Sequence, residues 1–251
     1  MNDTSWVCLH VHLSHRQDDY LRDVVRPLFQ SMMDGELVDR CFFLRYWQEG
    51  PHIRVRLHPR ISADRARIRH ALLENSSDWL REGPAAPEID ERSWLDAVRP
   101  WAAAEGERDV LPPLPHGSLV ESTYRPEHDR YGRGAVLEAV ERHFTDSSRL
   151  ALRHLEHDMP TRARLTLTAT WLAESHAEGL VSDNPALAGS PLAHSVAELV
   201  HALRTADDAP PISRVVRDCA HLLANRLGIG PLQEDALRAL VLATRADRAF
   251  A

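Results

Sequence analysis

The stretch CFFLRYWQEGPHIRVRL, residues 41–57, constrains the fold of this chain more than any other segment. Both halves are rich in β-branched and aromatic residues, and a Gly-Pro pair separates them, which is typical of a β-hairpin. Side chains alternate between the two faces of a strand. The alternation predicts two groups on opposite faces: His52, Arg54 and Arg56 on one, and Ile53, Val55 and Leu57 on the other.

The polar face of this hairpin predicts an anionic partner. We expect Trp47 to pair with His52 across the turn, which places Arg45 opposite Arg54. The face then carries three guanidiniums, an imidazole and an indole, with no carboxylate. Like charges that lie opposite each other on a sheet are destabilising. Either acidic residues reach this face from elsewhere in the fold, or a ligand with a carboxylate or a phosphate binds there.

Composition limits the chemistry that the chain can perform. The 251 residues are 43% hydrophobic and 27% charged, as in ordinary globular proteins. A net charge of −7 argues against general binding to nucleic acid or to an anionic membrane, so an anion site must be a local pocket. All 30 residues of the Lys+Arg total are arginine, which excludes a Schiff-base lysine and a Walker A lysine.

Cysteine usage and hydropathy predict a cytoplasmic protein. Cys8, Cys41 and Cys219 lie far apart without a CxxC pair, which is typical of buried thiols in a reducing compartment. No segment approaches the ~18 consecutive apolar residues that a membrane span requires. The N-terminal residues lack the basic region and apolar run of a secretory signal peptide.

Periodicity in the first half of the chain predicts the order β-α-β-β-α-β. The predicted elements are a strand over 5–13, a helix over 16–34 interrupted by Pro27, hairpin strands over 41–47 and 52–58, a helix from an N-cap at Ser62 to about Leu80, a short helix over 91–103 in the long loop 83–117, and a strand over 118–125. This order is the split βαβ arrangement of ferredoxin-like sheets.

The second half has helical periodicity throughout. We expect helices over 134–157, 160–178, 191–206, 212–227 and 232–247. The fold class is therefore α+β, with a small antiparallel sheet in residues 1–125 and a helical part in residues 126–251.

Two further segments hold candidate functional residues. In YRPEHDRYGRG, Arg130 and Tyr131 stand just before glycines, where a loop can present their side chains toward the sheet. In DCAHLLANRLGIG, which predicts the end of a helix, His221 and Asn225 share a face at i and i+4.

The three motifs together, FFLRYWQEGPHIRVRL, Y-x-P-E-x-x-R-Y-G and AHLLANRLGI, resemble the C-terminal elimination domain of lantibiotic dehydratases. The same domain occurs as stand-alone "thiopeptide-type bacteriocin biosynthesis" proteins. The resemblance spans about Trp6 to Glu234 and implies one elimination-type domain over residues 1–251. In that family, a glutamylating enzyme or domain uses glutamyl-tRNA to esterify Ser or Thr of a precursor peptide. The elimination domain then expels glutamate and leaves dehydroalanine or dehydrobutyrine.

The resemblance also implies site residues and partners. The catalytic residues implied are Arg54, Arg56, Arg130 and His221, and the expected substrate contacts are Arg45, His52, Tyr131 and Asn225. Taken without the resemblance, the two residues suit structural roles better: Tyr131 as a packed ring and Asn225 as a hydrogen bonder at the helix end. The chain departs from the family pattern at Arg133, where members often have a second glycine. The expected partners are a precursor peptide with its leader, a separate tRNA-dependent glutamylation enzyme and, as is common in the family, a second copy of the chain.

The chemistry of β-elimination suits these residue types. His221, with an ordinary pKa of ~6.5, is the candidate base for the Cα proton. Arginines supply permanent cations for the developing enolate and the glutamyl carboxylates, and cations beside His221 would lower its pKa. This mechanism needs neither a metal nor an organic cofactor. His10 and His12 share a strand face, but no ligand set of recognisable spacing accompanies them.

Two alternatives remain open. Pyridine synthases of thiopeptide pathways are similar to this domain and join two dehydroalanines by a formal (4+2) cycloaddition that expels the leader peptide. The retained arginines and histidine, together with a length of 251 residues, favour elimination. A subunit that binds the peptide substrate and presents it to a partner, without catalysis, is the third hypothesis.

Overall fold

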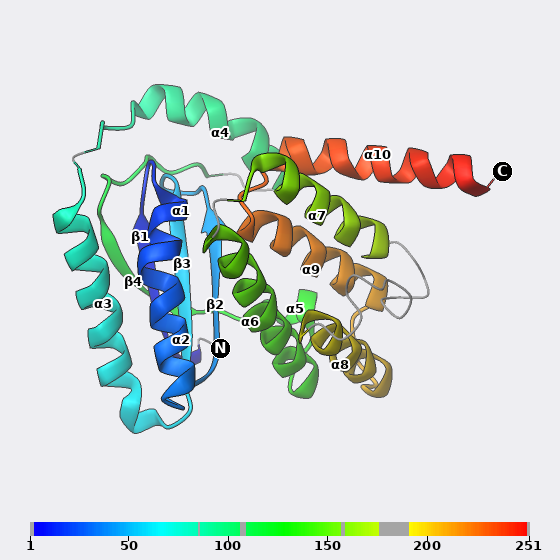
Figure 1. The fold of residues 1–251 in the computed structure, drawn as a ribbon, viewed down its shortest axis with the longest axis horizontal. Helices are drawn as coiled ribbons and strands as arrows, with labels where there is room; N and C mark the ends of the chain where they lie inside the picture. Colours follow the sequence, from blue (N-terminus) through cyan, green and yellow to red (C-terminus); the bar gives the residue numbers. More distant parts are fainter. Residues whose placement is uncertain (1–2, 85, 106–108, 157–158, 176–190, 250–251) are drawn as a thin grey trace. The chain divides into compact units, whose positions relative to one another are not determined.

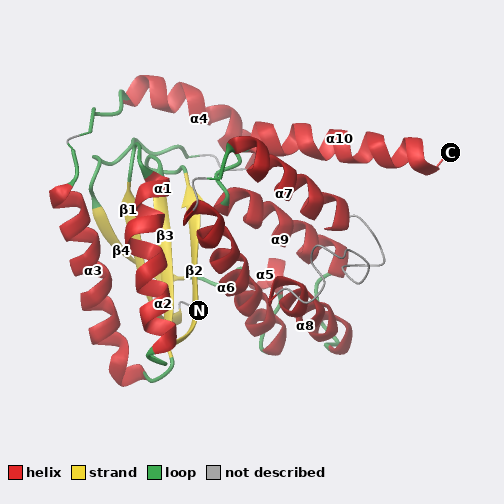
Figure 2. Cartoon of the chain, in the orientation of Figure 1, coloured by secondary structure: helices red, strands yellow, loops and turns green. Residues whose placement is uncertain are grey.

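The computed structural model describes residues 3–84, 86–105, 109–156, 159–175 and 191–249. The chain divides into two compact units, Met1–Arg125 and Pro126–Ala251. The described part of the first unit combines a sheet with helices, and that of the second unit contains helices and no strand (Figure 2). The α+β class predicted from the sequence is confirmed.

The sheet of the first unit has four antiparallel strands in the order β2-β3-β1-β4. The strands are β1 (Asp3–His12), β2 (Val38–Tyr46), β3 (His52–Pro59) and β4 (Leu119–Tyr124). The first and third strands lie in the centre, and a helical connection follows each of them. The predicted order β-α-β-β-α-β and its ferredoxin-like sheet are therefore present.

The helices of the first unit follow the predicted ranges closely. They are α1 (Gln17–Tyr20), a π-helical turn (Leu21–Val25), α2 (Arg26–Asp34), α3 (Arg65–Glu82) and α4 (Glu91–Glu105). The interruption expected at Pro27 takes the form of the π-helical turn, which ends two residues before the proline. Proline has no N–H to donate, so the preceding turn adjusts its hydrogen bonding and the helical stretch continues.

The start of α3 differs from the prediction. Ser62 is not an N-cap; it begins the 3-10 turn Ser62–Asp64, and no side chain caps the helix that follows. The N–H of Asp64 donates to the carbonyl of Ile61 at 3.0 Å. A backbone hydrogen bond therefore satisfies a donor that a serine hydroxyl was expected to satisfy.

One face of the sheet forms the core of the first unit. Helices α1, α2 and α3 cover this face (Figure 1). Ile53, Val55 and Leu57 of β3 point into it and are fully buried, as the alternation predicted. Burial of each such side chain contributes roughly 1.5–3 kcal/mol. Within this core the hydroxyl of Tyr20 lies 2.8 Å from that of Ser76 and joins the two helical segments.

The register of the hairpin differs from the prediction by one residue. Tyr46, not Trp47, pairs with His52, and Arg45 pairs with Ile53. The connecting loop is one residue longer than expected, and Glu49 and Gly50 both adopt positive φ within it. Because side chains alternate along a strand, this shift moves Arg45 to the opposite face from Arg54.

The second unit consists of helices within its described residues. They are α5 (His128–Tyr131), α6 (Ala135–Glu156), α7 (Thr161–Ser175), α8 (Pro191–Thr205), α9 (Ile212–Arg226) and α10 (Pro231–Ala249). Every predicted helix of this half has a counterpart, although residue 157 of the first and residues 176–178 of the second lie outside the described part. The short helix α5 was not predicted.

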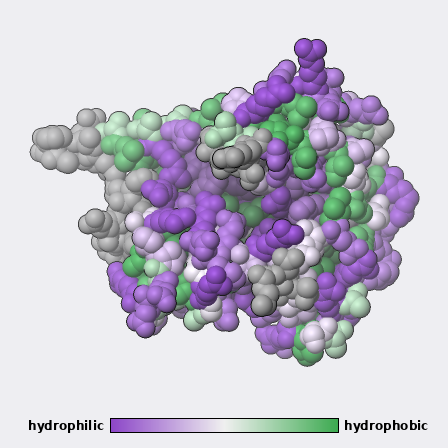
Figure 3. Space-filling model, turned by 180° about the vertical axis from the view of Figure 1, so that it is seen from behind, coloured by the Kyte–Doolittle hydropathy of each residue, from purple (hydrophilic) through white to green (hydrophobic). Residues whose placement is uncertain are grey.

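Three properties of the described residues complete the fold. Cys8, Cys41 and Cys219 are buried free thiols, as expected. Among the described helices, none has both the length and the apolar character that crossing a bilayer requires. The face of the molecule drawn in Figure 3 is mostly hydrophilic, with apolar residues in separate groups.

Candidate active site

Arg54 and Arg56 lie on the sheet face opposite helices α1–α3. The guanidinium carbon of Arg54 lies 3.5 Å from the centroid of the Tyr46 ring. Its Nε donates a hydrogen bond to Nε2 of His52 at 3.1 Å. Burial lowers the pKa of Arg54 to about 10, although Tyr46 opposes that shift. The side chain is therefore a fixed cation at neutral pH.

The histidines beside Arg54 are neutral at neutral pH, and hydrogen bonds fix the ring of His52. Nδ1 of His52 donates to the carbonyl of Gly50 at 2.9 Å, so its Nε2 is free to accept from Arg54. Burial, and then the charge of Arg54, lower the pKa of His10 to about 3. Burial is also the main cause that lowers the pKa of His52 to about 3. The two rings stack with centroids 5.0 Å apart. The positive charge of this face therefore resides on its arginines.

Arg56 is held by aromatic rings. Its guanidinium carbon lies 5.4 Å from the ring centroid of Phe42 and 5.0 Å from that of Tyr124. Neither Arg56 nor Arg54 forms an ion pair with any residue in the described part of the chain. Glu49 lies near enough to Arg54 to oppose the lowering of its pKa, but it forms no ion pair with it. Two half-buried guanidiniums without an ion-paired carboxylate form a local site that attracts anions.

Arg45 does not belong to this face, contrary to our prediction. Its Nη2 donates to Oδ1 of Asp18 at 2.5 Å, and its Nη1 donates to Oε1 of Gln17 at 3.3 Å. Both partners belong to α1, which covers the other face of the sheet. Because the register places Arg45 there, the side chain links β2 to α1, and a contact between Arg45 and substrate stays a prediction.

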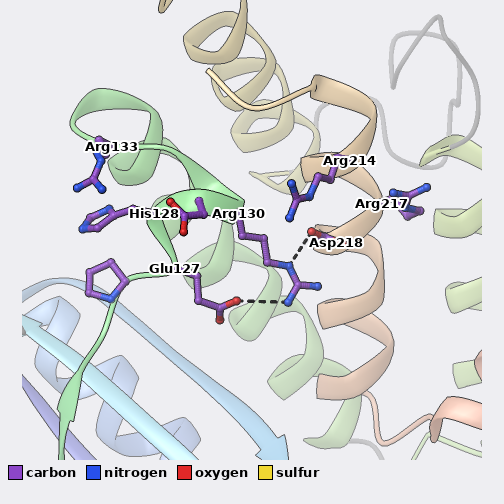
Figure 4. A pocket seen from close by; sticks show the side chains of 9 residues that line it. Glu127, His128, Arg130, Arg133, Arg214, Arg217 and Asp218 are labelled. Atoms are coloured by element: carbon purple, nitrogen blue, oxygen red, sulfur yellow. Dashed lines mark hydrogen bonds and ion pairs between the residues drawn. The ribbon is translucent and has the colours of Figure 1, made fainter. Parts of the chain in front are cut away.

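Arg130 of the second unit is paired with two acidic residues, which was not predicted. It lies in the short helix α5, and its Nε donates to Oδ2 of Asp218 at 2.7 Å. Its Nη1 donates to Oε2 of Glu127 at 3.3 Å (Figure 4). The hydrogen bond to Asp218 is the main cause that raises the pKa of Arg130. The guanidinium lines a pocket of about 620 Å³ and is held in place by α9 and by its own segment.

His221 of α9 lies within hydrogen-bond distance of a buried carboxylate. Its Nδ1 lies 2.6 Å from Oε2 of Glu234 in α10, whose side chain is only 4% exposed. The Nε of Arg238 donates to the other oxygen of Glu234 at 3.0 Å. Burial by itself raises the pKa of Glu234, but His221 and Arg238 outweigh it and the pKa is lowered. Within the second unit, the neighbour of His221 is therefore an acid, where we had expected cations.

The remaining predicted contacts of the second unit have structural surroundings. Tyr131 is 4% exposed, and its ring lies edge-on to Phe144 with centroids 5.3 Å apart. These surroundings are those of a packed structural ring. Asn225 lies half-buried in the last turn of α9, where its backbone carbonyl accepts from the N–H of Gly228 at 3.0 Å. Whether either side chain contacts substrate stays a prediction.

The structure brings His52, Arg54 and Arg56 together on one face, and it places Arg130 and His221 in the second unit. Sequence reasoning missed the carboxylates that hold the latter two residues. Asp218 stands at the start of the DCAHLLANRL motif, three residues before His221, and this proximity was the available signal. Among the described residues, no group of histidines, cysteines and acids is arranged to hold a metal ion.

The sequence matches the family model described as lantibiotic biosynthesis dehydratase, C-terminal, over residues 6–186. The chain belongs to this family. Membership places this lantibiotic dehydratase C-terminal protein in the biosynthesis of ribosomally made, modified peptides. No functionally curated protein matches the sequence.

The fold is shared with solved structures, of which three are described here. The pyridine synthase TbtD from thiomuracin biosynthesis has 20% identity and a TM-score of 0.69, covering 97% of this chain and 98% of its own. TsrL has 18% identity and a TM-score of 0.60, covering 98% and 95%. The tRNA-dependent lantibiotic dehydratase MibB from Microbispora sp. 107891 has 20% identity and a TM-score of 0.57; the match covers 98% of this chain but 28% of MibB. Because TbtD matches almost end to end, the length of the chain does not argue against a pyridine synthase.

Proposed function

We propose that this protein is a lyase that expels glutamate from glutamylated Ser or Thr residues of a precursor peptide. The products are dehydroalanine or dehydrobutyrine and free glutamate. The observation that carries the proposal is the pair Arg54 and Arg56, two half-buried cations on one sheet face without an ion pair in the described chain. A glutamyl ester brings a carboxylate and releases a second one, so it supplies anions that can pair with these two arginines.

His221 acts as the base in this proposal. It takes the Cα proton, the electron pair of that C–H bond forms the Cα=Cβ double bond, and the Cβ–O bond breaks as glutamate leaves with its carboxylate. Glu234 accepts from Nδ1 of His221, which leaves Nε2 as the proton acceptor. A carboxylate that orients an imidazole in this way is a recurring arrangement for a general base.

Arginines stabilise the charge that develops during this reaction. Arg54 and Arg56 bind carboxylate oxygens and the enolate, because planar guanidiniums donate two parallel hydrogen bonds. Arg130 is a third cation, and Asp218 and Glu127 fix its position before substrate arrives. A separate tRNA-dependent glutamylation enzyme supplies the ester, as the tRNA dependence of MibB suggests.

The proposal is tested with a glutamylated precursor peptide and mass spectrometry. Wild-type protein is expected to convert the adduct to the dehydrated peptide. Arg56→Ala should lower kcat by about 10²–10³, the usual effect of removing one charge-stabilising donor. His221→Ala should lower it by about 10²–10⁴, as for loss of a general base. The exposed residue Arg67 of α3 offers a control, and Arg67→Ala should leave the rate unchanged. Full activity in the first two variants would refute the assignment.

One observation favours a second candidate, a pyridine synthase. The fold and length match TbtD, which is a pyridine synthase, over 97% of this chain. Such an enzyme would join two dehydroalanines of one peptide by a formal (4+2) cycloaddition and expel the leader. Incubation with a linear peptide that already contains dehydroalanines decides this point. Formation of a macrocycle and free leader supports the second candidate, and recovery of unchanged peptide excludes it.

A further inference from the structure

The pocket around Arg130 contains guanidiniums that the proposed reaction does not use. Arg133 follows α5, and Arg214 and Arg217 lie in the first two turns of α9. All three side chains are exposed, and none forms an ion pair with a described residue. Three neighbouring cations without counter-ions repel one another, so a bound anion would stabilise this arrangement.

The acidic residues of the pocket do not balance the positive charge of these arginines. Glu127 and Asp218 are both engaged by Arg130. Among the residues that line the pocket, Asp129 is then the one carboxylate left to offset the charges of Arg133, Arg214 and Arg217. The α9 N-terminus adds partial positive charge because its first N–H groups lack a side-chain cap. The pocket is therefore moderately cationic, and it is anchored by a fixed Arg130.

The arrangement of the arginines suits an extended ligand. Figure 4 shows Arg133 beside α5 and Arg214 directed toward the space next to Arg130, while Arg217 extends from α9 on the side away from Arg130. Side chains that point in different directions around α9 suit an extended ligand better than a single small anion. A segment of chain lying across the start of α9 can meet them one after another.

The charge balance favours carboxylates over phosphates. A nucleic acid presents a continuous row of phosphates, which Asp129 in the pocket and the net charge of −7 would repel. A few carboxylates spaced along a peptide match a few spaced guanidiniums. We infer that Arg133, Arg214 and Arg217 bind an acidic segment of the peptide substrate that lies outside the residues undergoing reaction. The inference rests on the proposed function in that the substrate is a peptide.

Binding to a labelled oligoglutamate peptide, followed by fluorescence anisotropy, tests this site without turnover. The test protein replaces the three pocket arginines together, as Arg133→Gln, Arg214→Gln and Arg217→Gln. The matched control carries the same loss of charge at three exposed arginines elsewhere, as Arg65→Gln, Arg67→Gln and Arg153→Gln. Each exposed charge contact contributes little, so the loss of all three should weaken binding by the pocket variant about five- to a hundredfold. The control should bind as wild type does.

The inference would be overturned if the control variant lost as much affinity for oligoglutamate as the pocket variant, or if the wild-type protein bound an oligoglutamine peptide equally well. It would also be overturned if equimolar free glutamate or phosphate displaced the peptide, or if an RNA oligonucleotide bound more tightly than the peptide. Arg214→Gln alone, expected to weaken binding about two- to fivefold, covers the case of a triple variant that does not fold. Because no catalysis is measured, binding can hold while the lyase assay fails, or fail while the lyase assay succeeds.

Discussion

Nδ1 of His221 and Oε2 of Glu234 lie 2.6 Å apart, with the carboxylate buried between α9 and α10. The histidine is itself 39% exposed. One ring nitrogen is thus held by the protein while the ring remains accessible. This combination suits a general base whose orientation and tautomer are set before substrate binds.

Replacing Glu234 should impair the base without removing it. In Glu234→Gln, the amide can no longer stabilise a positively charged His221, so we expect kcat to fall by about 10²-fold or more while KM changes little. Nitrogen-15 NMR of the histidines provides the second readout, because the Nδ1-protonated tautomer of His221 should lose its predominance. A Glu234→Gln protein with wild-type kcat and an unchanged tautomer would show that the ion pair is structural.

Replacing Asp218 should release Arg130. The Arg130 side chain is 37% exposed, so solvent screens this pair and Asp218→Asn should cost less than about 1 kcal/mol of unfolding free energy. The larger effect should be on kcat/KM, because the guanidinium loses the partner that fixes its Nε. Chemical denaturation and steady-state kinetics measure the two effects separately. Arg149 and Asp146 of α6 offer a control pair, and Asp146→Asn should leave kcat/KM unchanged.

The buried histidines of the sheet predict a loss of stability on acidification. The pKa of His10 is lowered from 6.5 to about 3 in the folded protein, mainly by burial. Below pH 6.5, His10 of the unfolded chain binds a proton that the folded chain excludes. The free energy of unfolding is therefore unaffected by His10 above pH 6.5, and it decreases as the pH falls from 6.5 toward 3. Between about pH 6.5 and about pH 5, each such histidine should cost roughly 1–2 kcal/mol.

The variant His10→Gln removes one of these titrations. Urea unfolding at the two pH values should therefore show a smaller loss of stability for His10→Gln than for the wild-type protein. The exposed His70 provides the control, and His70→Gln should follow the wild type. An identical pH dependence in all three proteins would contradict a half-buried, neutral His10.

The sequence allowed the faces of the hairpin to be predicted, but not its register. Alternation along residues 52–57 depends on local chemistry, and the structure confirms it. The register depends on loop length, and here Glu49 adopts a positive φ that is uncommon for a glutamate. A loop of that kind cannot be recognised from residue types, so Arg45 was assigned to the wrong face.

The partners in the long-range contacts of the site could not be predicted from periodicity either. Arg130 and Asp218 are 88 residues apart in the chain, and no periodicity connects them. His221 and Glu234 stand on separate helices, on either side of the break at Gly228–Gly230. Motifs identified Arg130 and His221 as candidate residues, but the carboxylates that orient them follow from tertiary packing.

The most direct test of the central claim supplies the wild-type protein with two peptides of the same core sequence. One carries glutamyl esters on its Ser and Thr residues, and the other is linear and already dehydrated. We predict release of free glutamate and dehydroamino acids from the first peptide, with the second recovered unchanged. Conversion of the second peptide to a macrocycle with loss of its leader, while the first keeps its glutamyl groups, would contradict the lyase assignment.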